Sequence, residues 1–117
     1  MTMQQLPASA DALAIEVSER EGRTLVALQG ALDVGTASRL DEKFAEMSRR
    51  GTSNVDLDIA GLEFMDSSGL SVVVAEHKRV KADGGGLVIH HPSRRVIRLF
   101  QTHGLMSYLV VRPRMST

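Results

Sequence analysis

The residues best placed to do chemistry lie in one short segment, Asp66-Ser67-Ser68-Gly69. A strand-like pattern ends before it at Ala60, a loop follows, and an amphipathic helical pattern begins at Ser67 or Ser68. Two hydroxyls and a carboxylate are therefore expected at the N-terminus of a helix. The first turn of a helix has backbone N–H groups without intrahelical partners and the positive end of the helix dipole, which together stabilise an anion by about 0.3–1 kcal/mol.

A phosphate on one of these serines would therefore be tolerated without unfolding the helix. It would add a charge of roughly −1.5 to −2 beside Asp66 and would repel a partner whose contact surface is neutral or acidic. A local modification of this kind acts as a switch for binding. The segment thus has the chemistry of a regulatory phosphorylation site.

A simpler interpretation of the same residues stays open at this point. Asp and Ser are ordinary N-cap residues in front of an apolar helix. Gly69 fits that interpretation less well, because a glycine inside the first turn weakens a helix by up to about 1 kcal/mol. A close approach by another chain would explain Gly69, since glycine has no Cβ to obstruct the contact.

The elements that position this segment alternate as in an α/β domain. Alternating apolar residues predict strands, and apolar residues at spacings of three and four predict helices. The predicted strands are 13–18, 24–29, 55–59, 87–90 and 108–111. The predicted helices are 36–50, 67–81 and one that starts at 92–93 and stops at Gly104. The turn Glu21-Gly22-Arg23 makes a hairpin of the first two strands. Helices between the later strands imply right-handed crossovers and mostly parallel pairing.

One strand also indicates how the layers are arranged. Apolar and acidic side chains alternate strictly along Val55-Asp56-Leu57-Asp58-Ile59. In the strand before it, the pattern is expected to break at Gly30-Ala31-Leu32-Asp33. Strands covered on both faces are instead continuous apolar runs. We therefore predict a mixed, mostly parallel sheet of about five strands with helices mainly on one face, the other face being partly exposed to water.

Composition narrows the class of protein. The chain has 117 residues, 43% of them hydrophobic, which is the size of one domain with its own core. The 14 basic and 14 acidic side chains balance, which argues against a nucleic-acid binder, and there is no cysteine for disulfides or thiolate chemistry. No stretch reaches the roughly 20 apolar residues that span a bilayer, and no signal-peptide pattern is present. We expect a cytoplasmic protein without nucleic-acid or membrane partners, in which 1–11 form a flexible arm, 12–112 the domain and 113–117 a tail.

The histidines do not predict a metal site. His90 and His91 are adjacent, and adjacent strand residues point to opposite faces of a sheet, so we expect their side chains not to converge. His77 lies on the apolar side of the second helix and is interpreted as a core or boundary histidine whose polar atoms have partners.

A family resemblance decides between the interpretations of the Asp-Ser-Ser-Gly segment. Phe64-Met65-Asp66-Ser67-Ser68-Gly69-Leu70 resembles the phosphorylation-site motif of anti-sigma factor antagonists in the STAS family. The resemblance extends from about Ala12 to Val111. The segment 30–33 resembles the Gly-Glu-Leu-Asp turn of the family, with Ala31 in place of the Glu. Residues 55–58 resemble the central strand of the family, and residues 100–105 resemble the end of its last long helix.

The resemblance implies a partner-switching mechanism. An unmodified antagonist binds an anti-sigma factor that is also a serine kinase, and a sigma factor is released. The kinase, which carries ATP and Mg²⁺ in its own pocket, phosphorylates the antagonist, which then dissociates, and a phosphatase resets it. By position Ser67 is the phosphoacceptor and Ser68 the weaker candidate. The residues expected to contact the partner are Asp33, Asp66, Ser67, Ser68, Gly69 and Ser71, and no catalytic residue or cofactor is expected on this chain.

Three alternatives belong to other classes. A serine hydrolase needs Gly-x-Ser-x-Gly, and Met65-Asp66-Ser67-Ser68-Gly69 lacks the first glycine. A phosphoaspartate receiver needs a carboxylate cluster and a lysine after its last strand, where this chain has Arg112-Pro113. The third alternative keeps the fold but makes the chain a STAS scaffold or a subunit of a stress-sensing or lipid-transport complex without control of a sigma factor. We predict a phosphorylation-regulated binding protein that is not an enzyme.

Overall fold

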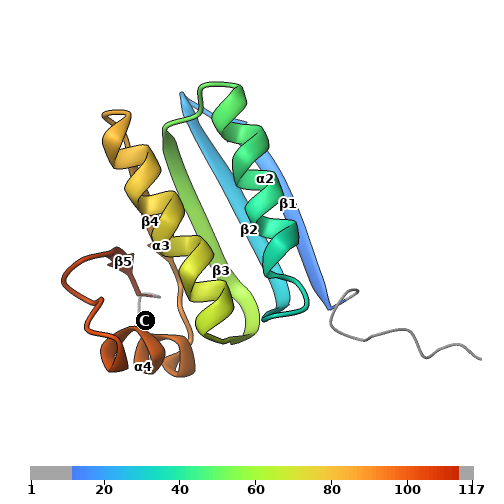
Figure 1. Ribbon diagram of the computed structural model, residues 1–117, viewed down its shortest axis with the longest axis vertical. Coiled ribbons are helices and arrows are strands. Elements are labelled where there is room, and N and C mark those ends of the chain that lie inside the picture. Colours follow the sequence, from blue (N-terminus) through green and yellow to red (C-terminus); the bar gives the residue numbers. More distant parts are fainter. Residues whose placement is uncertain (1–11, 114–117) are drawn as a thin grey trace, which may run out of the picture.

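The elements follow one another in the order that the sequence predicts (Figure 1). The structure is a computed structural model that describes residues 12–113. Its strands are β1 (Leu13–Arg20), β2 (Arg23–Leu32), β3 (Asn54–Met65), β4 (Gly86–His90) and β5 (Val110–Arg112), and its helices are α2 (Ala37–Arg49), α3 (Ser67–Ala82) and α4 (Arg94–Thr102). The predicted arm, 1–11, and residues 114–117 of the predicted tail lie outside the described part of the chain.

The strands form one mixed sheet in the spatial order β1-β2-β3-β4-β5. β1 and β2 are antiparallel, and the other neighbours are parallel, as predicted. A two-residue turn joins the hairpin, and both of its residues have positive φ, 56° at Glu21 and 80° at Gly22. This is the backbone twist that suits a tight connection between antiparallel strands.

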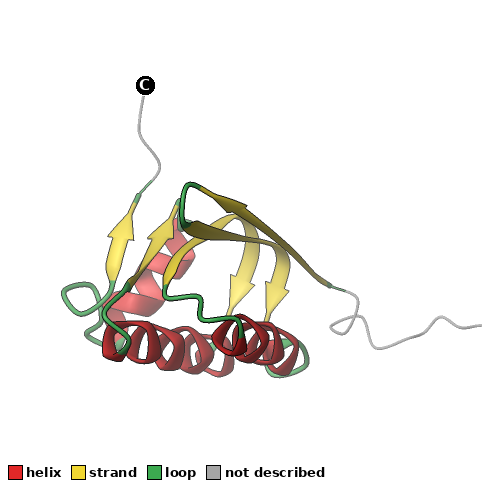
Figure 2. Ribbon diagram, turned by 90° about the horizontal axis from the view of Figure 1, so that it is seen from above, coloured by secondary structure: helices red, strands yellow, loops and turns green. Residues whose placement is uncertain are grey.

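The two longer helices lie side by side against one face of the sheet, which confirms the predicted layer arrangement (Figures 1 and 2). Val55, Leu57 and Ile59 of β3 are buried beneath them, whereas the alternating Asp56 and Asp58 are half-buried on the opposite face. We call the helix-covered side the inner face and the other side the outer face. Helix α4 adds its buried Val96 and Phe100 to the same core.

β1, β2 and β3 are all longer than the sequence predicts, and β1 continues to Arg20. β2 continues through the segment that was expected to break it and ends at Leu32, and β3 continues past Ala60 to Met65. Parallel pairing between β2 and β3 is maintained over this extra length, with register shifts between Ala27 and Gln29 and between Gly30 and Ala31. The local turn signals were thus overridden by tertiary pairing, which a propensity argument does not include.

The last strand is shorter than predicted, because Tyr108 and Leu109 both donate backbone hydrogen bonds to the Leu105 carbonyl (3.0 and 2.9 Å) and belong to a turn. Local signals in the sequence mark two of the helix ends. Gly51 follows α2 with φ +81°, the left-handed backbone conformation that commonly ends an α-helix. Ser93 is the N-cap of α4, and its Oγ accepts a hydrogen bond from Val96 N at 3.2 Å. None of the helices in the described range combines the length and hydropathy needed to cross a membrane.

Candidate functional site

The ends of β2 and β3 bring the predicted site together. Asp66 N donates a hydrogen bond to Leu32 O at 3.2 Å, so the first residues after the two strands, Asp33 and Asp66, are neighbours. Ser67 then begins α3. The loop after β2 and the junction of β3 with α3 lie at the same end of the domain in Figure 1.

Asp66 is the N-cap of α3. Its backbone is extended (φ −114°, ψ −172°), and its Oδ1 accepts hydrogen bonds from Ser68 N at 2.9 Å and Gly69 N at 3.2 Å. The carboxylate therefore already satisfies two of the N–H groups that an isolated helix start would leave free. The interpretation of this segment as an N-cap is therefore confirmed for Asp66.

The loop that carries Asp33 is held by its own side chains. Asp33 Oδ1 accepts from Gly35 N at 2.9 Å. The Thr36 hydroxyl, fully buried, accepts from Asp33 N and donates to Ala31 O, both at 2.9 Å. Thr36 was missed in the sequence, although an Asp followed three residues later by Thr before a helix is a recognisable turn signal. Asp33 and Thr36 therefore fix the shape of the loop.

The three serines of the predicted site differ in accessibility. Ser67, the first helical residue, is exposed, and within residues 12–113 its hydroxyl forms no hydrogen bond. Ser68 is half-buried. Ser71, one turn later, is exposed, and its hydroxyl donates to Ser67 O at 2.9 Å. Ser67 is therefore the most available hydroxyl at the start of α3.

Gly69 lies inside the protein rather than on the surface that a partner would contact. A Cβ at this position would meet Leu32 Cγ at 2.5 Å and Leu32 O at 2.8 Å. The close approach that requires glycine is therefore made by Leu32 of the same chain, and the explanation by another chain is wrong. The contact lets α3 begin directly against the end of β2.

Two apolar side chains at this end of the sheet face solvent. Val34, in the loop after β2, is 80% exposed, and Phe64, near the end of β3, is 38% exposed. Phe64 is aligned with Ala31 in the β2–β3 register, next to the loop that carries Val34. The sequence signal for Val34, an apolar residue inside a polar turn, was available but was not used. We define the Ser67 surface as Asp33, Val34, Phe64, Asp66, Ser67 and Ser71.

The Ser67 surface suits recognition better than catalysis. It combines exposed apolar side chains with carboxylates, and the first turn of α3 contains no basic residue. The Ser67 hydroxyl has no hydrogen-bonded histidine or carboxylate in the described structure that could serve as its base.

The adjacent histidines contradict the prediction that they diverge. β4 ends at His90, and His91 has a left-handed backbone (φ +61°), which brings both rings to the outer face with centroids 6.0 Å apart. His90 Nε2 lies 2.9 Å from Asp56 Oδ1, and His91 Nδ1 lies 3.3 Å from Asp58 Oδ1. Among the described residues, no group of three or more histidine and carboxylate side chains is arranged to hold a metal ion.

Comparison with known proteins agrees with this architecture. The family model for the STAS domain matches residues 14–117. The chain is 35% identical over 91 residues to the anti-sigma-B factor antagonist of Bacillus subtilis, covering 78% of this chain and 83% of that protein. An anti-sigma factor antagonist from Mycobacterium paratuberculosis has the same fold, with a TM-score of 0.80 at 20% identity over 90% of this chain and 89% of that one.

A further solved structure is that of the Bacillus cell fate determinant SpoIIAA in its phosphorylated form. It matches with a TM-score of 0.69 at 22% identity, over 86% of this chain and 93% of SpoIIAA. The α/β fold, the Asp-Ser-Ser-Gly junction and the match over residues 14–117 lead to one assignment: this chain belongs to the STAS domain family.

Proposed function

We propose that this protein is an anti-sigma factor antagonist, which binds an anti-sigma factor and thereby frees a sigma factor, and that phosphorylation of Ser67 switches it off. The observation that carries the proposal is the exposed Ser67 hydroxyl at the start of α3, at the same end of the sheet as the exposed apolar side chains of Val34 and Phe64. The named relative in Bacillus subtilis, an anti-sigma-B factor antagonist, supports the role. An antagonist acts by binding, which agrees with the prediction that the chain is not an enzyme.

The switch works through charge, since the residues that define the Ser67 surface include two carboxylates and no cation. A phosphate on Ser67 adds a charge of roughly −1.5 to −2. Asp66 already occupies two backbone donors, and Asp33 stands next to it, so the added charge faces the solvent near two carboxylates. The helix dipole offsets part of this repulsion, which keeps α3 folded. A partner seated on Val34 and Phe64 would lose its contact.

The chemistry of phosphorylation is assigned to the partner. In this proposal the anti-sigma factor is a serine kinase that holds ATP and Mg²⁺ in its own pocket. The Ser67 oxygen forms a bond to the γ-phosphorus while the bond from that phosphorus to ADP breaks, and the hydroxyl proton passes to a base on the kinase. A phosphatase later hydrolyses the phosphoserine. Both reactions place the chain in the cytoplasm, where sigma factors act.

The test is phosphorylation and binding measured with the purified protein and its cognate anti-sigma factor. Mass spectrometry after incubation with ATP should find one phosphate, on Ser67. The Ser67→Ala variant should bind the anti-sigma factor as tightly as the unmodified protein but accept no phosphate, and Ser68→Ala should still accept one. Isothermal titration calorimetry should show that the phosphorylated form binds the anti-sigma factor at least roughly tenfold more weakly than the unphosphorylated form.

Two results would contradict the proposal. One is a phosphate on a residue other than Ser67. The other is a complex that forms equally well with phosphorylated and unphosphorylated protein. A STAS scaffold without control of a sigma factor predicts this second result, because its Ser67 would have no regulatory role.

A further inference from the structure

β1 is an open edge of the sheet. Among the strands of residues 12–113 the order places it outermost, with β2 as its one neighbour in the sheet, as Figures 1 and 2 both show. Its 8 residues pair with β2 without a register shift, and beyond Leu13 all of them are at least partly exposed. A long, regular edge strand without proline or a bulge is a template for pairing with another strand.

The hydrogen bonds at the start of β1 show which backbone groups face this edge. Ala31 N donates to Ala12 O at 2.8 Å, so even-numbered residues direct their N–H and C=O groups toward β2. Odd-numbered residues therefore direct theirs outward. Arg39 Nη1, which reaches Leu13 O from outside the sheet at 2.6 Å, agrees with this assignment. The backbones of Ile15, Val17 and Glu19 are those directed toward the edge.

A second copy of β1 satisfies this pattern and the charges together. An antiparallel partner must place odd residues opposite odd residues. When Ser18 lies opposite Ser18, Val17 lies opposite Glu19, and Glu16 lies opposite Arg20 on the outer face. The two-fold axis repeats each of these pairs. Moving the register by two residues puts Glu16 opposite Ser18, and moving it by four puts Glu16 opposite Glu16, so only the first register pairs opposite charges directly.

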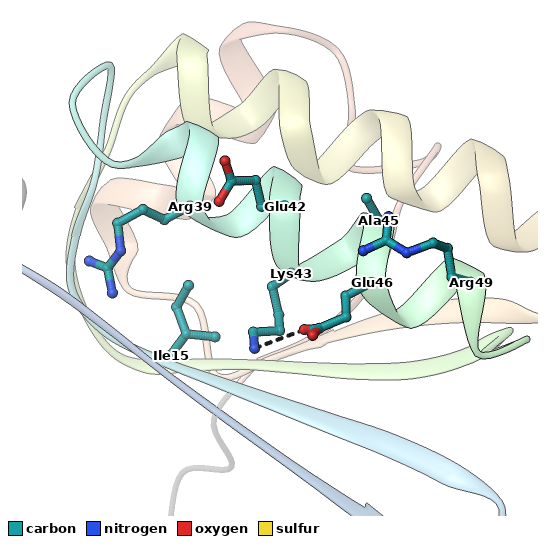
Figure 3. Close-up of a pocket in the computed structure, with 7 residues that line it drawn as sticks. All are labelled: Ile15, Arg39, Glu42, Lys43, Ala45, Glu46 and Arg49. Atoms are coloured by element: carbon teal, nitrogen blue, oxygen red, sulfur yellow. Dashed lines mark hydrogen bonds and ion pairs between the residues drawn. The ribbon is translucent and has the colours of Figure 1, made fainter.

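The inner face next to β1 is also complementary. Helix α2 leaves two hollows along the strand. One, of about 540 Å³, has Ile15 at its base with Arg39, Lys43 and Arg49 above, as Figure 3 shows. The other, of about 450 Å³, contains Val17, which is 41% exposed, with Lys43 and Arg50 among its lining residues.

The side chains of the paired register fit the second hollow. The partner copy's Glu19 lies opposite Val17 in that register, which brings a carboxylate to Lys43 and Arg50. Lys43 already pairs with Glu46 at 3.1 Å, and the chain's own Glu19 also lines the second hollow, so the wall of that hollow is a mixed-charge surface with two cations and two carboxylates. Opposite charges across a strand pair stabilise a sheet.

We propose that two copies of this chain associate through β1, as antiparallel strands with Ser18 opposite Ser18, to form one continuous sheet. The partner is a second copy rather than another protein, because the edge is complementary to itself in both charge and backbone parity. No residue of this contact belongs to the Ser67 surface, and the proposal therefore stands apart from the proposed function.

The first test is a charge-swap series followed by sedimentation velocity. The unmodified protein should show, with rising concentration, a species of twice the 12.7 kDa monomer mass. Glu16→Arg and Arg20→Glu each create two like-charge pairs and should weaken association roughly tenfold, whereas the double variant should restore it. The exposed Arg98 of α4 gives the matched control, since Arg98→Glu makes the same charge change outside the contact and should leave association unchanged.

The second test is disulfide trapping, which the absence of cysteine in the chain makes specific. Ser18 opposite itself would be a non-hydrogen-bonded pair with Cα atoms about 4.5 Å apart, within the range of a disulfide. Under mild oxidation Ser18→Cys should form a covalent dimer quickly, and Ser107→Cys, at an exposed serine in a loop, should not.

Three outcomes would overturn the proposal. The chain could sediment as a monomer at every concentration. The charge-swap double variant could fail to recover association while each single variant stays folded by circular dichroism. Val17→Cys could cross-link faster than Ser18→Cys, which would assign a different register.

Discussion

The imidazole of His77 on α3 meets the ring of Tyr108 edge-on, with ring centroids 4.8 Å apart and an interplanar angle of 67°. His77 is only 5% exposed, which confirms its prediction as a core or boundary histidine. The expectation that its polar atoms would have partners is wrong, because Nδ1 is buried and forms no hydrogen bond within residues 12–113. The contact packs the turn before β5 against α3, and the imidazole of His77 that makes it can be protonated.

This contact predicts a loss of stability in mild acid. Burial, with a smaller contribution from Lys81, lowers the pKa of His77 below its ordinary value. The unfolded chain, whose histidine pKa is about 6.5, therefore binds more protons than the folded protein as the pH falls below that value. The free energy of unfolding should decrease from there until the pH passes the lower folded-state pKa, below which the loss is complete.

Urea denaturation at pH 7.5 and pH 5.5 checks this prediction. His77→Phe keeps a ring against Tyr108 but cannot be protonated, so the variant should lose less stability between the two values than the unmodified protein. His103→Gln is a suitable control, because His103 is exposed at the end of α4. Equal pH dependence of His77→Phe and the unmodified protein would contradict the assignment.

A charged network stabilises the outer face, and its contribution is lost at a lower pH than that of His77. Arg23 binds both carboxylate oxygens of Asp56, at 2.7 and 3.0 Å, and His90 binds one of them at 2.9 Å, which joins β2, β3 and β4. The bond from Arg23 lowers the pKa of Asp56, against an opposing effect of burial. The stabilisation is therefore present above the unfolded-state pKa of about 3.9 and is lost as the pH falls through the lower folded-state value.

Asp56→Asn should accordingly lower the free energy of unfolding at pH 7 by about 1 kcal/mol, since the pair is half-exposed. The variant should also show a shallower loss of stability below pH 4. Asp41→Asn, an exposed aspartate on α2, should change neither quantity. If Asp56→Asn has the same acid sensitivity as the unmodified protein, the network does not contribute as stated.

The N-cap of α3 can be tested without touching the acceptor serine. Asp66→Ala removes the acceptor for Ser68 N and Gly69 N and should destabilise the protein by about 1 kcal/mol, whereas Asp66→Asn retains an acceptor oxygen and should cost only a few tenths. Thermal unfolding measures the difference. Equal destabilisation by both variants would show that the charge of Asp66, rather than its hydrogen bonds, stabilises the helix.

The order and type of the helices and strands around this site could be predicted from the sequence, but the lengths of the strands could not. Strict alternation in Val55–Ile59 was sufficient for the one-sided layering, because side-chain burial alternates with the backbone. The extension of β3 to Met65 depends on pairing with β2, a non-local contact that the residues 60–65 do not encode themselves. The left-handed backbone of His91 could likewise not be predicted from the sequence. Because of it, the side chain lies on the same face as His90 and not on the opposite one.

The sequence predicted which residues lie at the site, but it did not predict which of them are exposed on its surface. Asp66, Ser67 and Ser68 stand where the motif indicated, whereas Gly69 turned inward because Leu32 packs against it. Whether a residue near a helix start points outward depends on the neighbouring strand end. Val34 was missed for a related reason, since exposure is a property of the folded loop.

Val34 gives the sharpest test of the Ser67 surface as a binding site. An apolar side chain that is 80% exposed contributes almost nothing to the core, so Val34→Ala should leave the free energy of unfolding within about 0.5 kcal/mol of the unmodified value. If Val34 fills a pocket of the anti-sigma factor, the same change should weaken binding roughly tenfold. Val110→Ala, at an exposed valine of β5 outside the Ser67 surface, should alter binding by less than about twofold. Titration calorimetry of the three proteins separates the alternatives: equal affinities would place the partner on another face, and a loss confined to Val34→Ala, with its stability intact, would locate the contact at the loop between β2 and α2.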